Sequence, residues 1–183
     1  MRVHLNYGRG QRAVDLPDGL DISVIAKKAM PLLADPVRAM EAALAEPVGC
    51  PPLVEEAAGA RRACILICDF TRPVPNGVIL PPLIRTLLDA GLAPERITVL
   101  VATGLHRPNE GEELTALVGD PWVLETVEVA NHFAREDADH VLLGTTGRGT
   151  VVRLDRRFVD ADLRIATGLV EPHFMAAGPA GAR

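Results

Sequence analysis

The sequence predicts an α/β fold with a largely parallel central sheet and helices on both faces, and three observations support this expectation. Residues 64–68 and residues 96–102 are short, largely apolar runs, which are typical of strands buried on both faces. Residues 76–90 lie between them and show a helical pattern that Gly91 ends as a C-cap. A strand, a helix and a strand in this order form a βαβ unit, which joins parallel strands. The expected architecture is therefore Rossmann-like, with extra β-hairpin elements.

Length and composition indicate a single globular domain. The chain has 183 residues, of which 48% are hydrophobic and 23% are charged, and these values are close to those of average globular proteins. The formal net charge is −5 and no basic stripe is interleaved with aromatic residues, so nucleic acid is not an expected partner. Aromatic residues make up only 3% of the chain, so the core must be built from aliphatic side chains.

Cysteine usage and hydropathy bear on the cellular setting. Cys50, Cys64 and Cys68 are few, odd in number and not spaced as Cys-x-x-Cys, which indicates a reduced, cytoplasmic protein. The N-terminal residues lack the apolar segment of a signal peptide, and no apolar run reaches 18 residues. No membrane partner is therefore expected.

The remaining elements are predicted from short periodic segments between turn residues. Further strands are expected at residues 2–7, 13–16, 123–130, 140–143, 150–154 and 162–168. Further helices are expected at residues 21–28, 36–45, 53–58 and 110–118. The helix at 36–45 has the clearest start, because Asp35 can cap it and Pro36 suits its first position. Pro81 and Pro82 predict a kink or a shortening in the helix at 76–90.

The glycine-rich segment at residues 144–149 allows two interpretations. Its three glycines suggest a phosphate-binding loop, but such a loop needs a helix directly after it so that the helix N-terminus faces the phosphate. The following residues, 150–154, have the pattern of a strand. We therefore interpret residues 144–149 as the turn of a β-hairpin.

Polar side chains follow two neighbouring strands of the predicted sheet at the point where each strand ends. Asp69, Thr71 and Arg72 follow the first strand, and His106 and Arg107 follow the second. The carboxyl ends of parallel strands meet at one edge of a sheet, where α/β proteins bind ligands. These side chains should therefore line one crevice, and the two arginines should attract an anionic ligand there. The alternative is a strand-end turn with an ordinary Asp–Arg pair.

A third strand end carries another histidine. The strand predicted at residues 162–168 is followed by Leu-Val-Glu-Pro and then by His173. If this strand is parallel to the others, His173 should reach the same crevice as His106. The small residues that follow it would let a backbone approach a ligand closely.

Three motifs together resemble the N-terminal domain of the nickel-dependent lactate racemase family. They are Asp69-x-Thr-Arg-Pro, Ala102-Thr-Gly-x-His-Arg-Pro108 and Gly168-x-Val-Glu-Pro-His173, in this order. The resemblance covers nearly all of the chain. It implies that residues 1–183 form the N-terminal catalytic domain of a longer two-domain protein. Members of the family racemise or epimerise 2-hydroxy acids by hydride transfer with a nickel pincer nucleotide, a pyridinium-derived cofactor tethered to a lysine.

The resemblance also implies roles for individual residues. His106 and His173 match the two acid/base histidines, one on each face of the substrate, and imidazoles suit this task because they titrate near neutral pH. Arg72 matches a residue that holds the substrate carboxylate. The residues that would lie beside the cofactor are Asp69, Thr71, Gly178 and Gly181.

The final loop departs from the family pattern. In the family, a loop rich in Gly and Ser is followed by Arg-Lys, and that lysine carries the cofactor. Here the loop lacks the serine, contains Pro179 and ends at Arg183 without the lysine. We therefore expect the nickel pincer nucleotide only in a full-length protein, no metal ligand within this chain, a missing C-terminal domain as partner, and no activity from residues 1–183 alone.

Two other functions compete with this interpretation. One is a non-catalytic anion- or nucleotide-binding domain that keeps the fold and has lost the chemistry; the altered loop favours it, whereas His106 and His173 argue against it. The other is a nicotinamide-dependent dehydrogenase. It is disfavoured because no glycine-rich turn joins a predicted strand to a helix.

Overall fold

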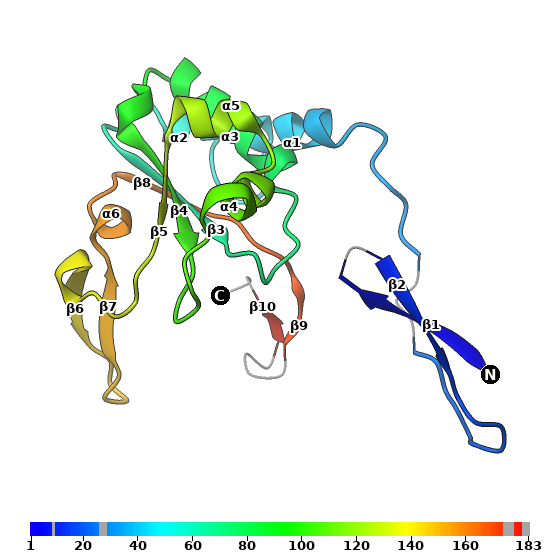
Figure 1. Cartoon of the computed structure of the whole chain (residues 1–183). Coiled ribbons are helices and arrows are strands. Elements are labelled where there is room, and N and C mark those ends of the chain that lie inside the picture. The colour runs from blue at the N-terminus through cyan, green and yellow to red at the C-terminus, as the bar shows by residue number, and fades with distance from the viewer. Residues whose placement is uncertain (9, 26–28, 174–177, 181–183) are drawn as a thin grey trace. The chain divides into compact units, whose positions relative to one another are not determined.

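The computed structural model describes residues 1–8, 10–25, 29–173 and 178–180, and only the backbone of residues 171–173 and 178–180 (Figure 1). The chain divides into two compact units, Met1–Leu32 and Leu33–Arg183.

The first unit contains an antiparallel hairpin of β1 (Arg2–Tyr7) and β2 (Gly10–Asp15). The second strand therefore starts three residues earlier than the sequence predicts, because every residue from Gly10 onward pairs with β1. The Arg2 guanidinium donates to both carboxylate oxygens of Asp15, at 2.7 and 2.8 Å. No helix forms at residues 21–25, so that part of the predicted helix at 21–28 is wrong; residues 26–28 lie outside the described residues.

The second unit is built on a four-stranded sheet in which all neighbouring strands are parallel. In spatial order the strands are β5 (Glu128–Asn131), β4 (Ile97–Ala102), β3 (Ala63–Cys68) and β8 (Leu163–Ala166). This confirms the predicted parallel α/β sheet with β3 and β4 at its centre. The register pairs Cys68 with Ala102, so the two central strands end at the same level.

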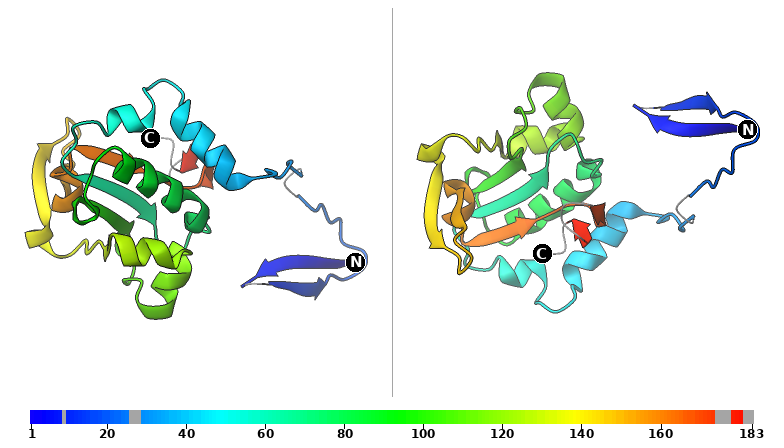
Figure 2. Two further views of the ribbon diagram at one scale, coloured as in Figure 1. Left: turned by 90° about the horizontal axis from the view of Figure 1, so that it is seen from above. Right: turned by 90° about the horizontal axis from the view of Figure 1, so that it is seen from below.

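Side chains alternate between the two faces of the central strands. Helices lie against both faces of the sheet (Figure 2). On one face Ile65, Ile67, Val99 and Val101 belong to a large buried cluster. The helices that pack against this cluster are α1 (Pro36–Ala45), α2 (Leu53–Glu56), α3 (Asn76–Asp89), α4 (Gly111–Val118) and α5 (Pro121–Thr126). The opposite face carries a smaller cluster, to which the short helix α6 (Arg156–Val159) contributes Phe158.

The helix α3 connects β3 to β4 and runs without interruption over 14 residues. Pro81 and Pro82 lie inside it and are buried, so the predicted shortening is wrong. Each proline lacks the N–H that would bond the carbonyl four residues before it. The burial of Leu80, Leu83 and Ile84 beside these prolines offsets the two missing hydrogen bonds.

The segment predicted as a strand at 123–130 is a strand only in its second half. Its first half belongs to α5, because the Asp120 side chain accepts the N–H of Trp122 and Pro121 takes the first helical position. The capping signal therefore overrides the alternating apolar pattern. The chain leaves this helix at Val127 and enters β5 as the edge strand of the sheet.

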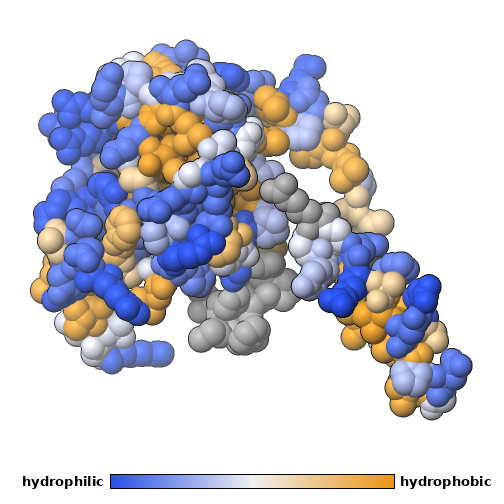
Figure 3. Space-filling model, viewed as in Figure 1, coloured by the Kyte–Doolittle hydropathy of each residue, from blue (hydrophilic) through white to orange (hydrophobic). Residues whose placement is uncertain are grey.

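The glycine-rich segment forms the turn of a hairpin, as predicted. The strands β6 (His140–Thr145) and β7 (Val151–Asp155) pair antiparallel on either side of it. No helix follows the glycines, so the segment lacks the helix N-terminus of a phosphate loop. Leu142, Leu143 and Val151 of this hairpin are exposed, and hydrophobic side chains appear on the hairpin in Figure 3.

The other short elements of the second unit are 3₁₀ turns and a backbone hairpin. The turns span Pro94–Arg96 and Asp137–Asp139. The hairpin consists of β9 (Glu171–His173) and β10 (Gly178–Ala180). Among the described residues, no helix combines the length and the apolar character needed to cross a membrane.

The start of α3 and the end of α4 approach each other through two glycines. A Cβ atom added to Gly77 would lie 2.7 Å from the carbonyl oxygen of Gly119. Gly119 itself has a positive φ of 72° as the C-cap of α4. Only a residue without a side chain fits at position 77, because the opposing atom belongs to the backbone and cannot rotate away.

Gly77→Ala should lower the free energy of unfolding by about 1–3 kcal/mol, the usual cost of overpacking, although Ala favours helix over Gly. Urea denaturation monitored by circular dichroism measures this change. Gly147→Ala is the matched control, because no atom lies within 4 Å of its added Cβ. Equal stability of the two variants would contradict the close approach of α3 and α4.

Candidate functional site

Several predicted site residues line one open crevice at the carboxyl ends of β3 and β4. The crevice has a volume of about 380 Å³. Its polar lining comes from the loops that follow the two strands, namely Asp69, Thr71, Arg72, Thr103 and His106. The parallel register of β3 and β4 brings these loops together, as the sequence predicts.

The central contact of the crevice joins the two loops. The Nδ1 atom of His106 lies 2.5 Å from Oδ2 of Asp69. Oδ1 of Asp69 accepts the Thr71 hydroxyl at 2.6 Å and the Thr71 backbone N–H at 3.2 Å. Both carboxylate oxygens are therefore engaged, so Asp69 is fixed in orientation and holds the imidazole ring in turn.

Asp69 is ionised at neutral pH. Burial opposes its charge, but the hydrogen bonds from Thr71 and His106 outweigh this effect and leave the pKa of Asp69 below its ordinary value. An ionised carboxylate only accepts hydrogen bonds. Nδ1 of His106 must therefore carry the proton of the contact, and in a neutral ring Nε2 is the basic atom.

Burial differs sharply between the two partners. The Asp69 side chain is 5% exposed, whereas the His106 side chain is 57% exposed. A buried carboxylate behind an accessible imidazole is the arrangement that orients a general base and stabilises its protonated form. The pair can therefore accept a proton from a molecule in the crevice, or donate one to it.

The loop after β4 is held by its own backbone and by the edge strand. The Thr103 hydroxyl donates to the carbonyl of His132, and the His106 N–H donates to the carbonyl of Thr103 at 2.9 Å. Gly104 between them has a φ of 57°, a conformation that favours glycine. Thr103 is 2% exposed, so the loop that carries His106 rests on a buried anchor.

The two arginines of the site behave differently. Arg72 lines the crevice, and its guanidinium donates to the Thr71 carbonyl at 3.3 Å. Arg107 lies just outside the crevice and lines an adjoining hollow of about 420 Å³, to which His106 also contributes. It forms an ion pair with Glu113 and lies over the ring of Phe70. The expectation that both arginines line one crevice is met by Arg72, whereas Arg107 lines the adjoining hollow. The sequence pattern alone did not reveal this, because nothing in it shows that Arg107 would turn to Glu113, six residues later in the helix that follows the loop.

Three predicted site residues lie in or after the hairpin of β9 and β10. His173 belongs to β9, and its backbone pairs with that of Gly178 in β10, but only the backbone is described at these positions. Gly181 lies outside the described residues. The meeting of His173 with His106, and the roles of Gly178 and Gly181, therefore remain predictions.

A second titratable cluster lies beside the crevice and was not predicted. The Nε2 atoms of His132 and His140 are 2.9 Å apart, and the rings meet edge to face. Burial lowers the pKa of His132. Near this pair, Arg157 bonds both the nearly buried carboxylate of Asp155 and the carbonyl of Asn131. The sequence signal for this cluster was the strand end at Asn131-His132. The residues that join it come from β6, β7 and α6, later in the chain.

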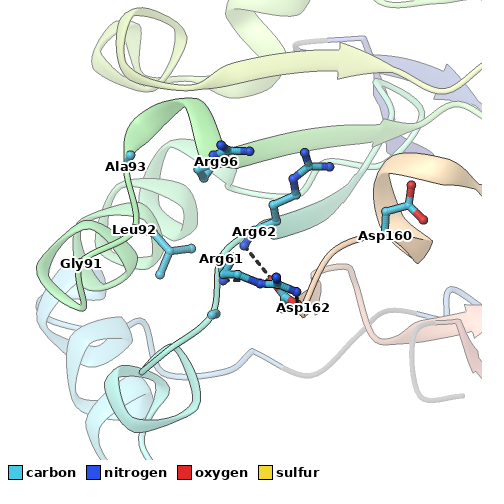
Figure 4. A pocket seen from close by; sticks show the side chains of 9 residues that line it. Arg61, Arg62, Gly91, Leu92, Ala93, Arg96, Asp160 and Asp162 are labelled. Atoms are coloured by element: carbon cyan, nitrogen blue, oxygen red, sulfur yellow. Dashed lines mark hydrogen bonds and ion pairs between the residues drawn. The ribbon is translucent and has the colours of Figure 1, made fainter.

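A larger hollow lies at the opposite edge of the sheet (Figure 4). Its volume is about 620 Å³, and its charged lining consists of Arg61, Arg62, Arg96, Asp160 and Asp162. Oδ2 of Asp162 accepts the N–H groups of Arg61 and Arg62 at 2.9 and 3.0 Å, so this carboxylate caps the entry into β3. The candidate acid/base residues lie instead at the carboxyl edge of the sheet, where the imidazole of His106 contacts the carboxylate of Asp69.

The described part of the chain lacks a cluster of side chains suited to a metal ion. No group of three or more His, Cys, Asp or Glu side chains there could hold a metal ion. The nearest approach to a ligand set near the crevice is the pair of imidazoles of His132 and His140.

Comparison with known proteins gives a consistent result. Residues 7–183 match the family described as the lactate racemase N-terminal domain. The lactate racemase of Thermoanaerobacterium thermosaccharolyticum is 31% identical over 176 residues, which cover 95% of this chain and 41% of that protein. The lactate racemase of Lactiplantibacillus plantarum is 37% identical over 138 residues, which cover 75% of this chain and 32% of that protein.

Solved structures agree with this match. The structure of the lactate racemase apoprotein from T. thermosaccharolyticum has a TM-score of 0.77 at 31% identity, over 95% of this chain and 40% of that one. A Thermotoga maritima protein at 22% identity has a TM-score of 0.59 over 74% of this chain and 34% of that one, and shows likeness of fold alone. The chain thus spans about two fifths of the length of the first of these relatives.

Asp69→Asn should lower the free energy of unfolding at pH 7 by about 1–3 kcal/mol, because charge-assisted bonds to a buried carboxylate are lost. The pKa of Asp69 is lower in the folded state than in the unfolded state. Its stabilising effect is therefore complete above the unfolded value of about 3.9 and is lost as the pH falls through the folded value.

Urea denaturation at a series of pH values measures this difference between parent and variant, which should shrink below about pH 4. Asp137→Asn is the control, because it breaks an ion pair in which Asp137 lies 2.6 Å from Arg153. The Asp137 side chain is 83% exposed, so little change in stability is expected. A pH-independent difference for Asp69→Asn would contradict the ionised state of Asp69.

Proposed function

Because this chain belongs to the lactate racemase family and matches its N-terminal domain, we propose that the protein containing it is a racemase or epimerase of lactate-like 2-hydroxy acids. The observation that carries the proposal is the contact between Asp69 and His106 at the carboxyl ends of β3 and β4. The chain covers about two fifths of the length of the T. thermosaccharolyticum relative, so the complete active site would include residues beyond this chain.

His106 acts in this proposal as a general acid and base on the 2-hydroxyl group. Interconversion of enantiomers through a carbonyl state requires the hydroxyl proton to leave and to return. Nε2 of His106 is basic and accessible, since Nδ1 is committed to Asp69. Asp69 stabilises the imidazolium that forms when the proton arrives. The 57% exposure of the His106 side chain supports this role, because a substrate could reach the ring.

Arg72 is proposed to hold the carboxylate of the hydroxy acid. It lines the same crevice as His106, and a guanidinium can bind a carboxylate through two parallel hydrogen bonds. A carboxylate held there would bring C2 and its hydroxyl group towards the imidazole. The two groups together would suit a small acid with a hydroxyl on the carbon next to the carboxylate, which is the substrate class proposed from the family match.

A racemase must serve both faces of C2, and His173 is proposed as the second acid/base residue. The support is the Glu-Pro-His sequence that follows β8, a strand parallel to β3. Parallel neighbours end at the same edge of a sheet, so the chain returns to the crevice edge after Ala166. Each histidine would then handle the hydroxyl proton of one enantiomer.

The nickel pincer nucleotide of the family, which accepts the hydride from C2 when bound, is proposed only for a full-length protein. The described residues provide no metal-ligand set, and the carboxylate of Asp69 is fully engaged by Thr71 and His106. We therefore assign this chain the acid/base and carboxylate-binding roles. A position beside the cofactor remains a prediction for Asp69, Thr71, Gly178 and Gly181.

In a full-length protein that racemises lactate, His106→Ala should lower kcat by about 10²–10⁴-fold, the usual contribution of an acid/base residue. Steady-state assays of both enantiomers measure this loss. His4→Ala is the control, because this exposed histidine lies in the other unit. Unchanged kcat in the His106 variant would remove it from the chemistry, and turnover by residues 1–183 alone would contradict the proposed need for further residues.

Deuterium at C2 of one enantiomer should be retained in the product. In this proposal His106 exchanges the hydroxyl proton with water, but it does not touch the hydrogen on C2. Mass spectrometry of the racemised product measures retention. Extensive loss of the label to water would indicate abstraction of the C2 proton by a base, and would contradict the assignment of His106 to the hydroxyl group.

A further inference from the structure

Arg107, the residue directly after His106, makes three strong contacts that lead away from the crevice. Its Nη1 and Nη2 atoms donate to the two carboxylate oxygens of Glu113 in α4, at 2.7 and 2.6 Å. Its guanidinium carbon lies 4.5 Å from the centre of the Phe70 ring. A bidentate ion pair and a cation–π contact together fix both the position and the plane of the guanidinium.

The two loops of the crevice are therefore linked twice, by consecutive residues. Asp69 contacts His106, and the next residue of each loop, Phe70 and Arg107, make a second contact. The first link places the imidazole, and the second limits how the loops can slide past one another. The Phe70–Arg107 link is in turn held to α4 by Glu113.

Asn109 completes the attachment on the other side of Pro108. It is fully buried. Its N–H donates to Oδ1 of Asn131 at 2.9 Å, and Nδ2 of Asn131 donates to its carbonyl at 2.8 Å. Its own Nδ2 donates to Glu113 at 2.5 Å. Glu113 thus receives hydrogen bonds from residues on both sides of Pro108, and the loop is tied to α4 and to β5.

The ion pair between Arg107 and Glu113 does little for overall stability. The Arg107 side chain is 61% exposed and that of Glu113 is 33% exposed, and exposed ion pairs contribute little to the free energy of unfolding. The contacts instead fix the position of the loop that carries His106, because most of them are made by residues of that loop. Glu113 also neutralises the charge of Arg107, which would otherwise stand uncompensated next to a histidine that must become cationic.

We propose that Arg107 is a positioning residue that, through Glu113 and Phe70, holds His106 in hydrogen-bonding register with Asp69. This proposal rests on the acid/base role proposed for His106. It assigns Arg107 no contact with the substrate, in contrast to Arg72. A positive charge alone would not serve this role. The planar guanidinium is needed, because it can bind both carboxylate oxygens of Glu113 while it lies over the ring of Phe70.

The test compares Arg107→Lys and Glu113→Gln with the parent 183-residue chain by NMR. The Nδ1 proton of His106 should give a protected downfield signal in the parent, and both variants should lose it. Amide exchange of His106 and Asn109 should become about tenfold faster in both variants. The midpoint of urea unfolding should stay close to that of the parent, which separates a local effect from unfolding.

Arg2→Lys is the matched control, because it disrupts another bidentate pair, with Asp15, in the other unit. It should leave the His106 signal unchanged. Retention of the signal in Arg107→Lys would show that charge alone suffices, and retention in Glu113→Gln would show that the pair does not position the loop. Either result would overturn the proposal.

Kinetics of a full-length protein provide the second readout. Arg107→Lys should lower kcat about tenfold or more with KM for lactate within about twofold, whereas Arg72→Lys should raise KM. A raised KM with unchanged kcat for Arg107→Lys would assign Arg107 to substrate binding and overturn the proposal. A full-length protein without racemase activity would refute the proposed function alone, since the NMR result would still decide the positioning role.

Discussion

The parallel pairing of β3 with β4 is the constraint on which the site depends. The pairing ends with Cys68 opposite Ala102, so both chains leave the sheet at the same level and turn into loops that face each other. Pairing shifted by one residue would reverse the faces of either strand and remove Ile65 or Val99 from the core. The burial of aliphatic side chains on these strands therefore also fixes the separation between an imidazole and a carboxylate.

Sequence reasoning predicted the parts of the structure that depend on local pattern. The buried strands, the crossover helix and the polar strand ends all have short-range signals, and the crevice with Asp69, Thr71, Arg72 and His106 follows from them. The direction of Arg107 could not be predicted, because Glu113 and Phe70 compete with the crevice for its guanidinium. The strand predicted at residues 123–130 was wrong in its first half, because the cap at Asp120 starts a helix there despite the alternating apolar pattern.

Three charged side chains in and around the crevice form ion pairs with partners that lie close by. Asp69 is paired with His106, Arg107 with Glu113 and Asp155 with Arg157. The consequence is that the chain's net charge of −5 says little about the crevice, where local pairs within a few ångströms dominate over charges screened beyond about 8 Å. A ligand entering the crevice therefore meets local dipoles and pairs more than the field of the whole chain.

The helix α4 joins two features that lie far apart in the sequence. Its end meets the start of α3 through Gly77 and Gly119, while its first turns present Glu113 to Arg107. Substitutions at these two sets of positions should therefore occur together during evolution. Lineages that enlarge a side chain at either glycine would displace α4, and they would have to compensate within the loop after β4. The co-variation of these positions among relatives would record the mechanical connection between the scaffold and the histidine loop.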